Sequence, residues 1–409
     1  LRKSGDVVLA DLGDAEKLED RARRALEDVR SSIRVGGGLT KGAPPTPTKT
    51  GAAKPVKKPR GRSAFQHGLR SLEDLYAGLW VPLEPALGSA DKILLSPDGL
   101  VNLVPFAALR DGQGRSLVER YQLAYLAGGK ELAGVEGAPP RPGSDLLLVA
   151  NPAFDKKVPA SAGEDGARRS RDFRTGFSPL PGTEREGKEI PALVGANNGE
   201  MTQVLVGKSA TEGAVKAVSS PRVLHLATHG FFLSDAAVAL DQGTEKASSK
   251  RGRSGKKRTA AVWYENPLVR SGLALAGANY AAKTTEGDDG LLTALEITGM
   301  DLSGTELVVL PACETGVGKV QNGEGVFALR RAFTLAGANN LLMSLWSTGD
   351  EVTARQLNAF YRKVQTLPPA EALRQAQLES IRELKAKYGV PPPGLWAPFI
   401  LQGAHAFGR

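Results

Sequence analysis

The sequence predicts an α/β fold with a mostly parallel β-sheet that is flanked by helices, and two observations favour it. In the second part of the chain, short apolar runs typical of buried strands alternate with longer segments of helical periodicity. Two of these runs, 222–228 and 306–311, end in polar loops that contain glycine, as strands do at the carboxyl edge of a parallel sheet. Apolar residues make up 41% of the 409 residues, which is enough for a sizeable core.

Residues 1–143 are expected to form a smaller α+β accessory region that packs against the remainder. An acidic start and apolar residues on one face predict a helix over 14–32, and helical periodicity returns over 69–79. Between them, residues 36–63 are rich in Gly, Pro, Thr and Lys and predict a disordered insertion. The strands expected in this region are 7–10, 92–95, 101–104 and 121–125.

Residues 144–409 are expected to form the main domain, because strands followed by helices at this spacing are typical of a parallel sheet covered on both faces. The expected strands are 146–150, 202–206, 222–228, 273–276, 306–311 and 340–345. The expected helices are 185–194, 211–218, 325–335, 351–364 and 370–387.

The net charge of +9 lies in two segments and not on a folded surface. Residues 36–64 contribute +7 and residues 241–261 contribute +5, which leaves the rest slightly acidic. A nucleic-acid-binding domain more often clusters Lys and Arg with aromatic residues on an ordered face, so nucleic-acid binding is not expected. No apolar run approaches ~18 residues, which argues against a transmembrane helix.

The beginning of the chain and its cysteine content bear on its cellular setting. The chain begins at Leu1, and its first dozen residues carry four charges, which excludes a signal-peptide core there. We therefore expect it to be part of a longer protein. Cys313 is the only cysteine, so no internal disulfide can form, which fits a reducing cytoplasm.

Reactive side chains follow two of the expected strands. His229 and then Gly230 follow strand 222–228, and Cys313 follows strand 306–311. If these strands are neighbours, the imidazole and the thiol point into one cleft, where the imidazole can raise the thiolate fraction. The backbone N–H groups of Gly230 and Cys313 are then candidates for an oxyanion hole.

These residues also have structural interpretations. A free cysteine is most often a buried small hydrophobe, but Cys313 opens a polar loop that contains glycine. His229 could be a structural loop histidine, and His225, inside the strand, is expected to be buried and hydrogen-bonded. A zinc site made of His225, His229 and Cys313 lacks an acid at ligand spacing, so no metal or other cofactor is predicted.

Several acids lie near the expected cleft. Asp350 follows a Trp-Ser-Thr-Gly segment after another strand, where it could cap the next helix or line the cleft and bind a cationic side chain. Glu314 adjoins the thiol. Glu324 stands between two glycines, where it could also start the helix expected at 325–335.

At these residues the sequence resembles the CHAT family, which are caspase-like cysteine peptidases commonly fused to tetratricopeptide repeats. The matching stretches are GDVVLADLG (5–13), LSPDGLVNLVPFAAL (95–109), HLATHG (225–230), DGLLTALEI (289–297), ELVVLPACETGVG (306–318), GEGVFALRRAFTLAGA (323–338), SLWSTGD (344–350), EALRQAQ (371–377) and WAPFILQG (396–403).

The resemblance implies a caspase-hemoglobinase-like fold, in which 1–143 is an accessory or pseudo-caspase-like region and 144–409 is the peptidase domain. It also implies a dyad of His229 and Cys313. Separases are distant relatives of the family, and in them an acid placed like Asp350 selects Arg before the scissile bond. Asp350 is therefore the main candidate for the S1 pocket, and Glu314 is the second.

The sequence thus predicts a cytoplasmic cysteine endopeptidase that cleaves a protein substrate after a basic residue, under the control of an upstream repeat or sensor domain. The alternative is a catalytically silent scaffold that binds other proteins. The basic segment 241–261 has two interpretations as well. It is a solvated insertion, or it is a pseudosubstrate or a site of cleavage in cis.

Overall fold

The computed structural model describes residues 8–37, 62–134, 146–155, 176–194, 202–233, 266–283, 288–311 and 324–408. Most of the insertion predicted at 36–63 and the whole basic segment 241–261 fall outside these residues, as do Cys313 and Glu314. The predictions made for them therefore stay predictions.

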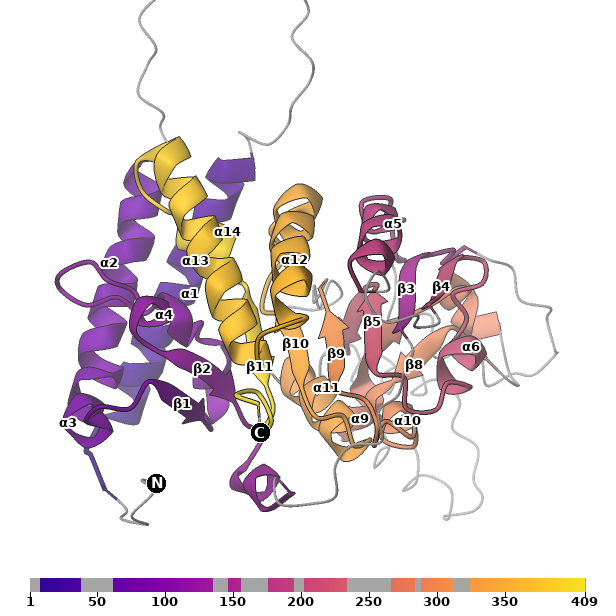
Figure 1. Ribbon diagram of the computed structural model, residues 1–409, viewed down its shortest axis with the longest axis horizontal. Helices are drawn as coiled ribbons and strands as arrows, with labels where there is room; N and C mark the ends of the chain where they lie inside the picture. Colours follow the sequence, from indigo (N-terminus) through magenta and orange to yellow (C-terminus); the bar gives the residue numbers. More distant parts are fainter. Residues whose placement is uncertain are drawn as a thin grey trace, which may run out of the picture.

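Eight strands form one sheet, in the order β1-β2-β11-β10-β9-β5-β3-β4 (Figure 1). All neighbouring strands in it run parallel except β10 and β11, which confirms the predicted mostly parallel α/β fold. The strands are β1 (Lys92–Leu95), β2 (Gln122–Tyr125), β3 (Leu146–Pro152), β4 (Thr202–Gly207), β5 (Val223–Ala227), β9 (Leu307–Leu310), β10 (Leu341–Ser344) and β11 (Phe399–Gln402).

Helices cover both faces of this sheet because its central strands are apolar on both sides. In β9, Val309 packs into one core with α5 (Thr183–Val194), α12 (Asp350–Val364) and α13 (Pro369–Tyr388). Its neighbours Val308 and Leu310 point the other way, into the larger core that includes α10 (Ala294–Ile297) and α11 (Glu324–Leu335). The other described helices of this part are α6 (Glu212–Lys216), α9 (Pro267–Arg270), α14 (Pro393–Trp396) and the 3₁₀ helix η7 (Ala278–Lys283).

The first region joins the same core. α1 (Ala15–Gly37) and α2 (Arg62–Leu79) lie side by side, and α14 packs against α1 (Figure 1). The predicted helical face is confirmed, since Ala22, Leu26 and Val29 of α1 are buried. The remaining elements are α3 (Glu84–Leu87), α4 (Leu117–Arg120) and the 3₁₀ helices η1 (Val81–Leu83), η2 (Gly99–Leu103), η3 (Phe106–Ala108) and η4 (Gly129–Gly134).

Two strand predictions in this region were wrong. Residues 101–103 belong to the 3₁₀ helix η2, which Asp98 caps at its N-terminus. The Asp98 carboxylate accepts a hydrogen bond from Gly99 N–H, and its carbonyl accepts one from Val101 N–H. Residues 8–10 form no strand either. Leu9 is 92% exposed, and no described strand lies beside it. The apolar side chains of this segment therefore have no partner strand against which to pack.

A second, three-stranded antiparallel sheet was not predicted. It consists of β6 (Gly230–Phe232), β7 (Ser271–Ala274) and β8 (Leu291–Thr293), in that order. The strand predicted at 273–276 is therefore real in part but lies in this small sheet. Strands this short show too few residues for a period to be recognised in the sequence.

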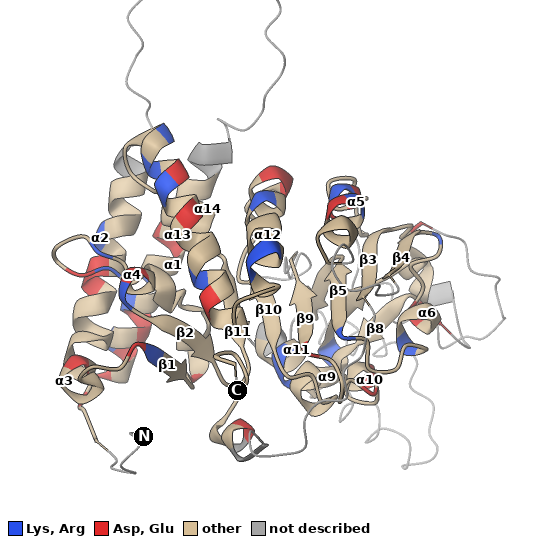
Figure 2. Ribbon diagram, viewed as in Figure 1, with Lys and Arg blue, Asp and Glu red and all other residues tan. Residues whose placement is uncertain are grey.

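Apart from Lys92 in the edge strand β1, the charged residues of the described chain lie on helices and loops, and the strands at the centre of the main sheet carry none (Figure 2). An unpaired charge on a strand that is buried on both faces would cost much free energy, because it would be removed from water. Within the described residues, no helix combines the length and the apolar character needed to cross a membrane.

Candidate functional site

The site lies at the carboxyl edge of the main sheet. β5 and β9 are neighbours and run parallel, with His225 opposite Val309, which confirms the condition that the sequence had left open. His229 follows the end of β5 directly. Cys313 follows Val309 in the sequence by as many residues as His229 follows His225, but it lies outside the described part of the chain.

The imidazole of His229 is oriented by a backbone carbonyl. Its Nε2 lies 2.8 Å from the carbonyl oxygen of Ser178, and a carbonyl can only accept, so Nε2 carries the proton. In the neutral ring the other nitrogen, Nδ1, is then an acceptor. The ring is half-buried beside Phe154 and Phe177, whose ring centroids lie 5.3 and 5.8 Å from its own. This side chain is placed to take up a proton at Nδ1.

Gly230 begins β6, the outer strand of the small sheet. It stands opposite Leu273, and the hydrogen bond beside this pair runs from Ala274 N–H to the His229 carbonyl at 2.8 Å. Opposite residues in an antiparallel ladder alternate between hydrogen-bonded and non-hydrogen-bonded pairs. Gly230 occupies a non-hydrogen-bonded position, so its N–H points away from β7.

Asp350 is the first residue of α12, and its side chain is exposed. Gly349 occupies the N-cap position, so the N-capping interpretation of Asp350 was wrong. The carboxylate lies directly over the Cα of Gly182, where an added Cβ would overlap Oδ2. Among the described residues, none makes a hydrogen bond or an ion pair with this carboxylate.

His225 is fully buried, as predicted. Its Nε2 lies 2.9 Å from Glu186 Oε2 of α5, and its Nδ1 lies 2.9 Å from the Tyr361 hydroxyl of α12. Burial raises the pKa of Tyr361 well above its ordinary value, so this hydroxyl stays protonated and donates to Nδ1. Both ring nitrogens are occupied, which counts against a zinc site that uses His225. Within the described residues, no group of three or more His, Cys, Asp or Glu is arranged to hold a metal ion.

The loop at 176–183 connects the two parts of the site that the structure describes. Its Ser178 carbonyl contacts His229, and its Gly182 lies against Asp350. No element was predicted for this loop from the sequence. One signal pointed toward it: the strand expected at 146–150 also ends in a polar residue, Asn151, at the same edge of the sheet.

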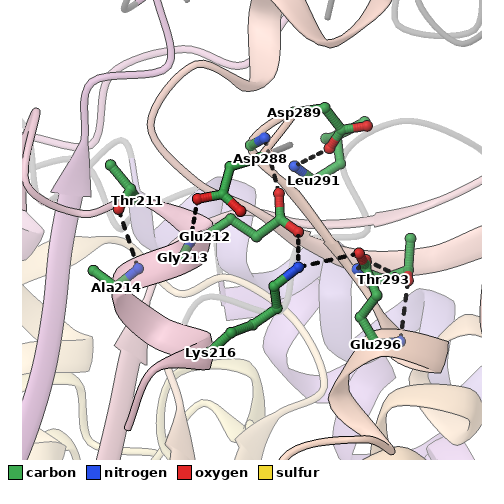
Figure 3. Close-up of polar contacts among 11 residues, drawn as sticks. Thr211, Glu212, Gly213, Ala214, Lys216, Asp288, Asp289, Leu291, Thr293 and Glu296 are labelled. Atoms are coloured by element: carbon green, nitrogen blue, oxygen red, sulfur yellow. Dashed lines mark hydrogen bonds and ion pairs between the residues drawn. The ribbon is translucent and has the colours of Figure 1, made fainter. Parts of the chain in front are cut away.

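A second polar cluster lies where α6, β8 and α10 meet, and it was also not predicted (Figure 3). Glu212 of α6 is buried, accepts a hydrogen bond from Gly290 N–H at 3.1 Å and lies 2.6 Å from Lys216 Nζ. Lys216 also reaches Glu296 of α10 at 3.4 Å. Burial, together with nearby Glu296 and Asp289, raises the pKa of Glu212 to about 7. The cluster joins α6, β8 and α10.

Comparisons with known proteins agree with one another. The CHAT domain family matches residues 69–404. Tetratricopeptide repeat protein 28 of Homo sapiens is 27% identical over 377 residues, which cover 88% of this chain, and the Mus musculus protein has the same identity and coverage. The chain spans only 14% of the length of these relatives.

Similar solved structures include a Saccharomyces cerevisiae separase–securin complex, with 11% identity, a TM-score of 0.37, and coverage of 97% of this chain and 23% of that one. A structure described as a protease has 9% identity, a TM-score of 0.40, and coverage of 82% of this chain and 68% of that one.

Proposed function

The chain belongs to the CHAT domain family, and from this premise we propose that it is a cysteine endopeptidase with Cys313 as nucleophile and His229 as its proton acceptor. The CHAT domain belongs to the clan of caspase-like cysteine peptidases. The observation that carries the proposal is the orientation of His229, whose Nε2–H is held by the Ser178 carbonyl at 2.8 Å. That bond leaves Nδ1 free for a thiol proton.

The proposed reaction needs only these groups and a water molecule. His229 Nδ1 takes the thiol proton of Cys313, and the thiolate attacks the carbonyl carbon of the scissile peptide bond. The N–H groups of Gly230 and Cys313 stabilise the oxyanion. His229 then gives its proton to the leaving amine, and a thioester remains. Water, deprotonated by His229, hydrolyses the thioester and restores the thiol.

The strand register supports this pairing. β5 and β9 are adjacent and in parallel, and equal numbers of residues separate each of the two reactive side chains from the paired positions His225 and Val309. The orientation of Gly230 N–H away from β7 supports its role in the oxyanion hole.

We further propose that the substrate is a protein cleaved after a basic residue. Asp350 offers a carboxylate that is exposed and unpaired among the described residues, at the same edge of the sheet as His229. Glu314 is the second candidate for this role. The relatives are named for tetratricopeptide repeats and are far longer than this chain, which supports control by an upstream repeat region. We also propose that the protein acts in the cytoplasm.

The dyad can be tested without knowing the substrate, because Cys313 is the only thiol and every alkylation reports on it. We expect iodoacetamide to modify the folded wild-type chain at pH 6.5 about 10-fold faster than a His229→Gln variant, whose thiol would titrate near ~8.5. The rates are measured by intact mass as a function of pH. His67→Gln, at an exposed position on α2, is the matched control and should behave as wild type.

Cleavage is tested with a peptide library. Cys313→Ala should abolish hydrolysis, and His229→Gln should lower kcat/KM by about 100-fold or more. Equal alkylation rates in wild type and His229→Gln, together with hydrolysis that survives Cys313→Ala, would show that the dyad is wrongly assigned.

The alternative is a scaffold that keeps the fold without catalysis, and the repeat-protein relatives favour it. An electrophilic peptide that carries a basic residue separates the two functions. Labelling of Cys313 supports the peptidase. Failure to label, together with alkylation that is insensitive to His229, supports the scaffold.

A further inference from the structure

Asn279 fixes the backbone of residue 177, immediately before the carbonyl that holds His229. Its Oδ1 accepts a hydrogen bond from Phe177 N–H at 2.7 Å, and its Nδ2 donates to the Phe177 carbonyl at 3.0 Å. The same Nδ2 donates to Asp155 Oδ1 at 2.8 Å. One amide therefore satisfies both backbone groups of Phe177, as a neighbouring strand would.

Asn151 fixes the same loop on the other side of Ser178. Its Oδ1 accepts from Leu180 N–H, its own N–H donates to Thr183 Oγ1, and its Nδ2 donates to Glu184 Oε1, each at 2.8 Å. Its backbone has φ of 40°, in the left-handed region that asparagine tolerates better than most residues. A strained conformation with three side-chain and backbone contacts indicates a position with a function.

We propose that Asn151 and Asn279 are positioning residues that clamp the loop on both sides of Ser178, so that its carbonyl holds the Nε2–H tautomer of His229. This inference rests on the proposed function. Neither asparagine has a described contact with the imidazole, and both act through the carbonyl. With the carbonyl displaced, the ring proton is free to move to Nδ1, and a ring protonated at Nδ1 cannot accept the proton of the thiol.

The residue type follows from the contacts. Each site requires an acceptor and a donor on two separate atoms of a short side chain, and the amide of asparagine supplies this pair. Asn279→Asp keeps the acceptor for Phe177 N–H but loses both donated bonds and places a carboxylate beside Asp155. Asn151→Gly tolerates the positive φ and removes all side-chain contacts, so any effect is not due to backbone strain. Asn151→Asp keeps the acceptor for Leu180 N–H, so this variant should hold the loop better than Asn151→Gly does.

The tautomer is read directly from long-range ¹H–¹⁵N spectra of the full chain labelled with ¹⁵N-histidine, at pH 8, where a free imidazole is neutral. A His229→Gln spectrum identifies the signal. We expect the Nε2–H form of His229 to dominate in the wild type and to give way to a mixture in Asn279→Asp and Asn151→Gly. Asn358→Ala, which removes an amide bonded to Glu189 on the surface of α5 and α12, is the matched control and should leave the tautomer unchanged.

In peptide hydrolysis, we expect kcat/KM to fall about 10- to 100-fold in the two clamp variants, mainly through kcat, and to stay unchanged in Asn358→Ala. An unchanged tautomer in both folded clamp variants, verified by circular dichroism, would overturn the inference. If the tautomer shifts but the wild type hydrolyses no peptide, the clamp stands and the peptidase function fails.

Discussion

At the scale of single residues, His229 and Asp350 each lie against one residue of the 176–183 loop. The Ser178 carbonyl takes the Nε2 proton of His229 and leaves Nδ1. At Asp350, the absence of a side chain on Gly182 makes room for the carboxylate. The next residue, Glu351, is paired with Arg355 at 2.9 Å and is not free in this way. Of these two adjacent acids, Glu351 forms an ion pair within α12, whereas Asp350 forms none with a described residue.

Asp350 should therefore determine the preference for a basic residue before the cleaved bond. We expect Asp350→Asn to lower kcat/KM for peptides with Arg at that position by roughly 10- to 100-fold, the worth of one hydrogen bond to a charged group. Peptides with a neutral residue there should be cleaved at an unchanged rate. Glu351→Gln is the matched control, since it removes an acid one residue away. An equal loss for basic and neutral peptides would point to Glu314 instead.

At the scale of elements, the cluster around Glu212 attaches the small sheet to the rest of the domain (Figure 3). Glu212 bonds the backbone at Gly290, Asp288 Oδ2 accepts from Gly213 N–H at 2.6 Å, and Glu296 closes a capping box with Thr293 at the start of α10. β6, which begins at Gly230, is held through β7 and β8 to this cluster. The position of the oxyanion candidate thus depends on carboxylates far from it in the sequence.

Folding raises the pKa of Glu212 to about 7, whereas the pKa of a Glu in the unfolded chain is about 4.3. Between these two pH values the folded chain keeps a proton on Glu212 that the unfolded chain has released. Stability is therefore expected to fall as pH rises between these two values and to level off above pH 7. Glu212→Gln removes this dependence. We expect the difference in melting temperature, variant minus wild type, to be about 2–4 °C larger at pH 8 than at pH 5.

The melting temperatures are measured by calorimetry at both pH values. Glu27→Gln, at an exposed position of α1, is the control and should show no such trend. The assignment fails if Glu212→Gln and wild type keep a constant difference between pH 5 and pH 8.

At the scale of the whole molecule, the first region and the candidate site share one sheet. β2 pairs with β11 through Tyr125 and Gln402, so the strands of the accessory region continue the main sheet. The boundary expected at 143/144 falls outside the described residues and stays a prediction. Arg330 of α11 reinforces this junction. It is fully buried, lies with its guanidinium 5.5 Å from the centre of the Tyr125 ring, and donates to Asn102 Oδ1 at 3.1 Å and to Gln402.

Burial lowers the pKa of Arg330 to about 10, so the side chain stays charged at neutral pH. Arg330→Ala should reduce the free energy of unfolding by about 2–5 kcal/mol, because it opens a cavity and leaves Asn102 and Gln402 without their donor. Denaturant titration measures the loss. The neighbouring exposed Arg331→Ala is the control and should change stability by no more than about 0.5 kcal/mol. Similar losses in both variants would contradict the role of Arg330 as a junction.

The sequence by itself determined the fold class, six strands and the longer helices of the main domain, and the two strand ends that carry the candidate site residues. These follow from local patterns: apolar runs such as 306–311 read as buried strands, and polar residues directly after them mark the carboxyl edge of the sheet. The family resemblance rested on the same stretches.

Only the tertiary structure decided which groups surround His229 and Asp350. Ser178, Asn151, Asn279 and Gly182 act through a backbone carbonyl, two amides and a missing side chain, none of which has a periodic signature in the sequence. The short strands β6, β8 and β11 were missed for a related reason: each exists because a partner strand far along the chain offers hydrogen bonds to it. Long-range contacts hold the reactive histidine in place, and local pattern alone does not encode them.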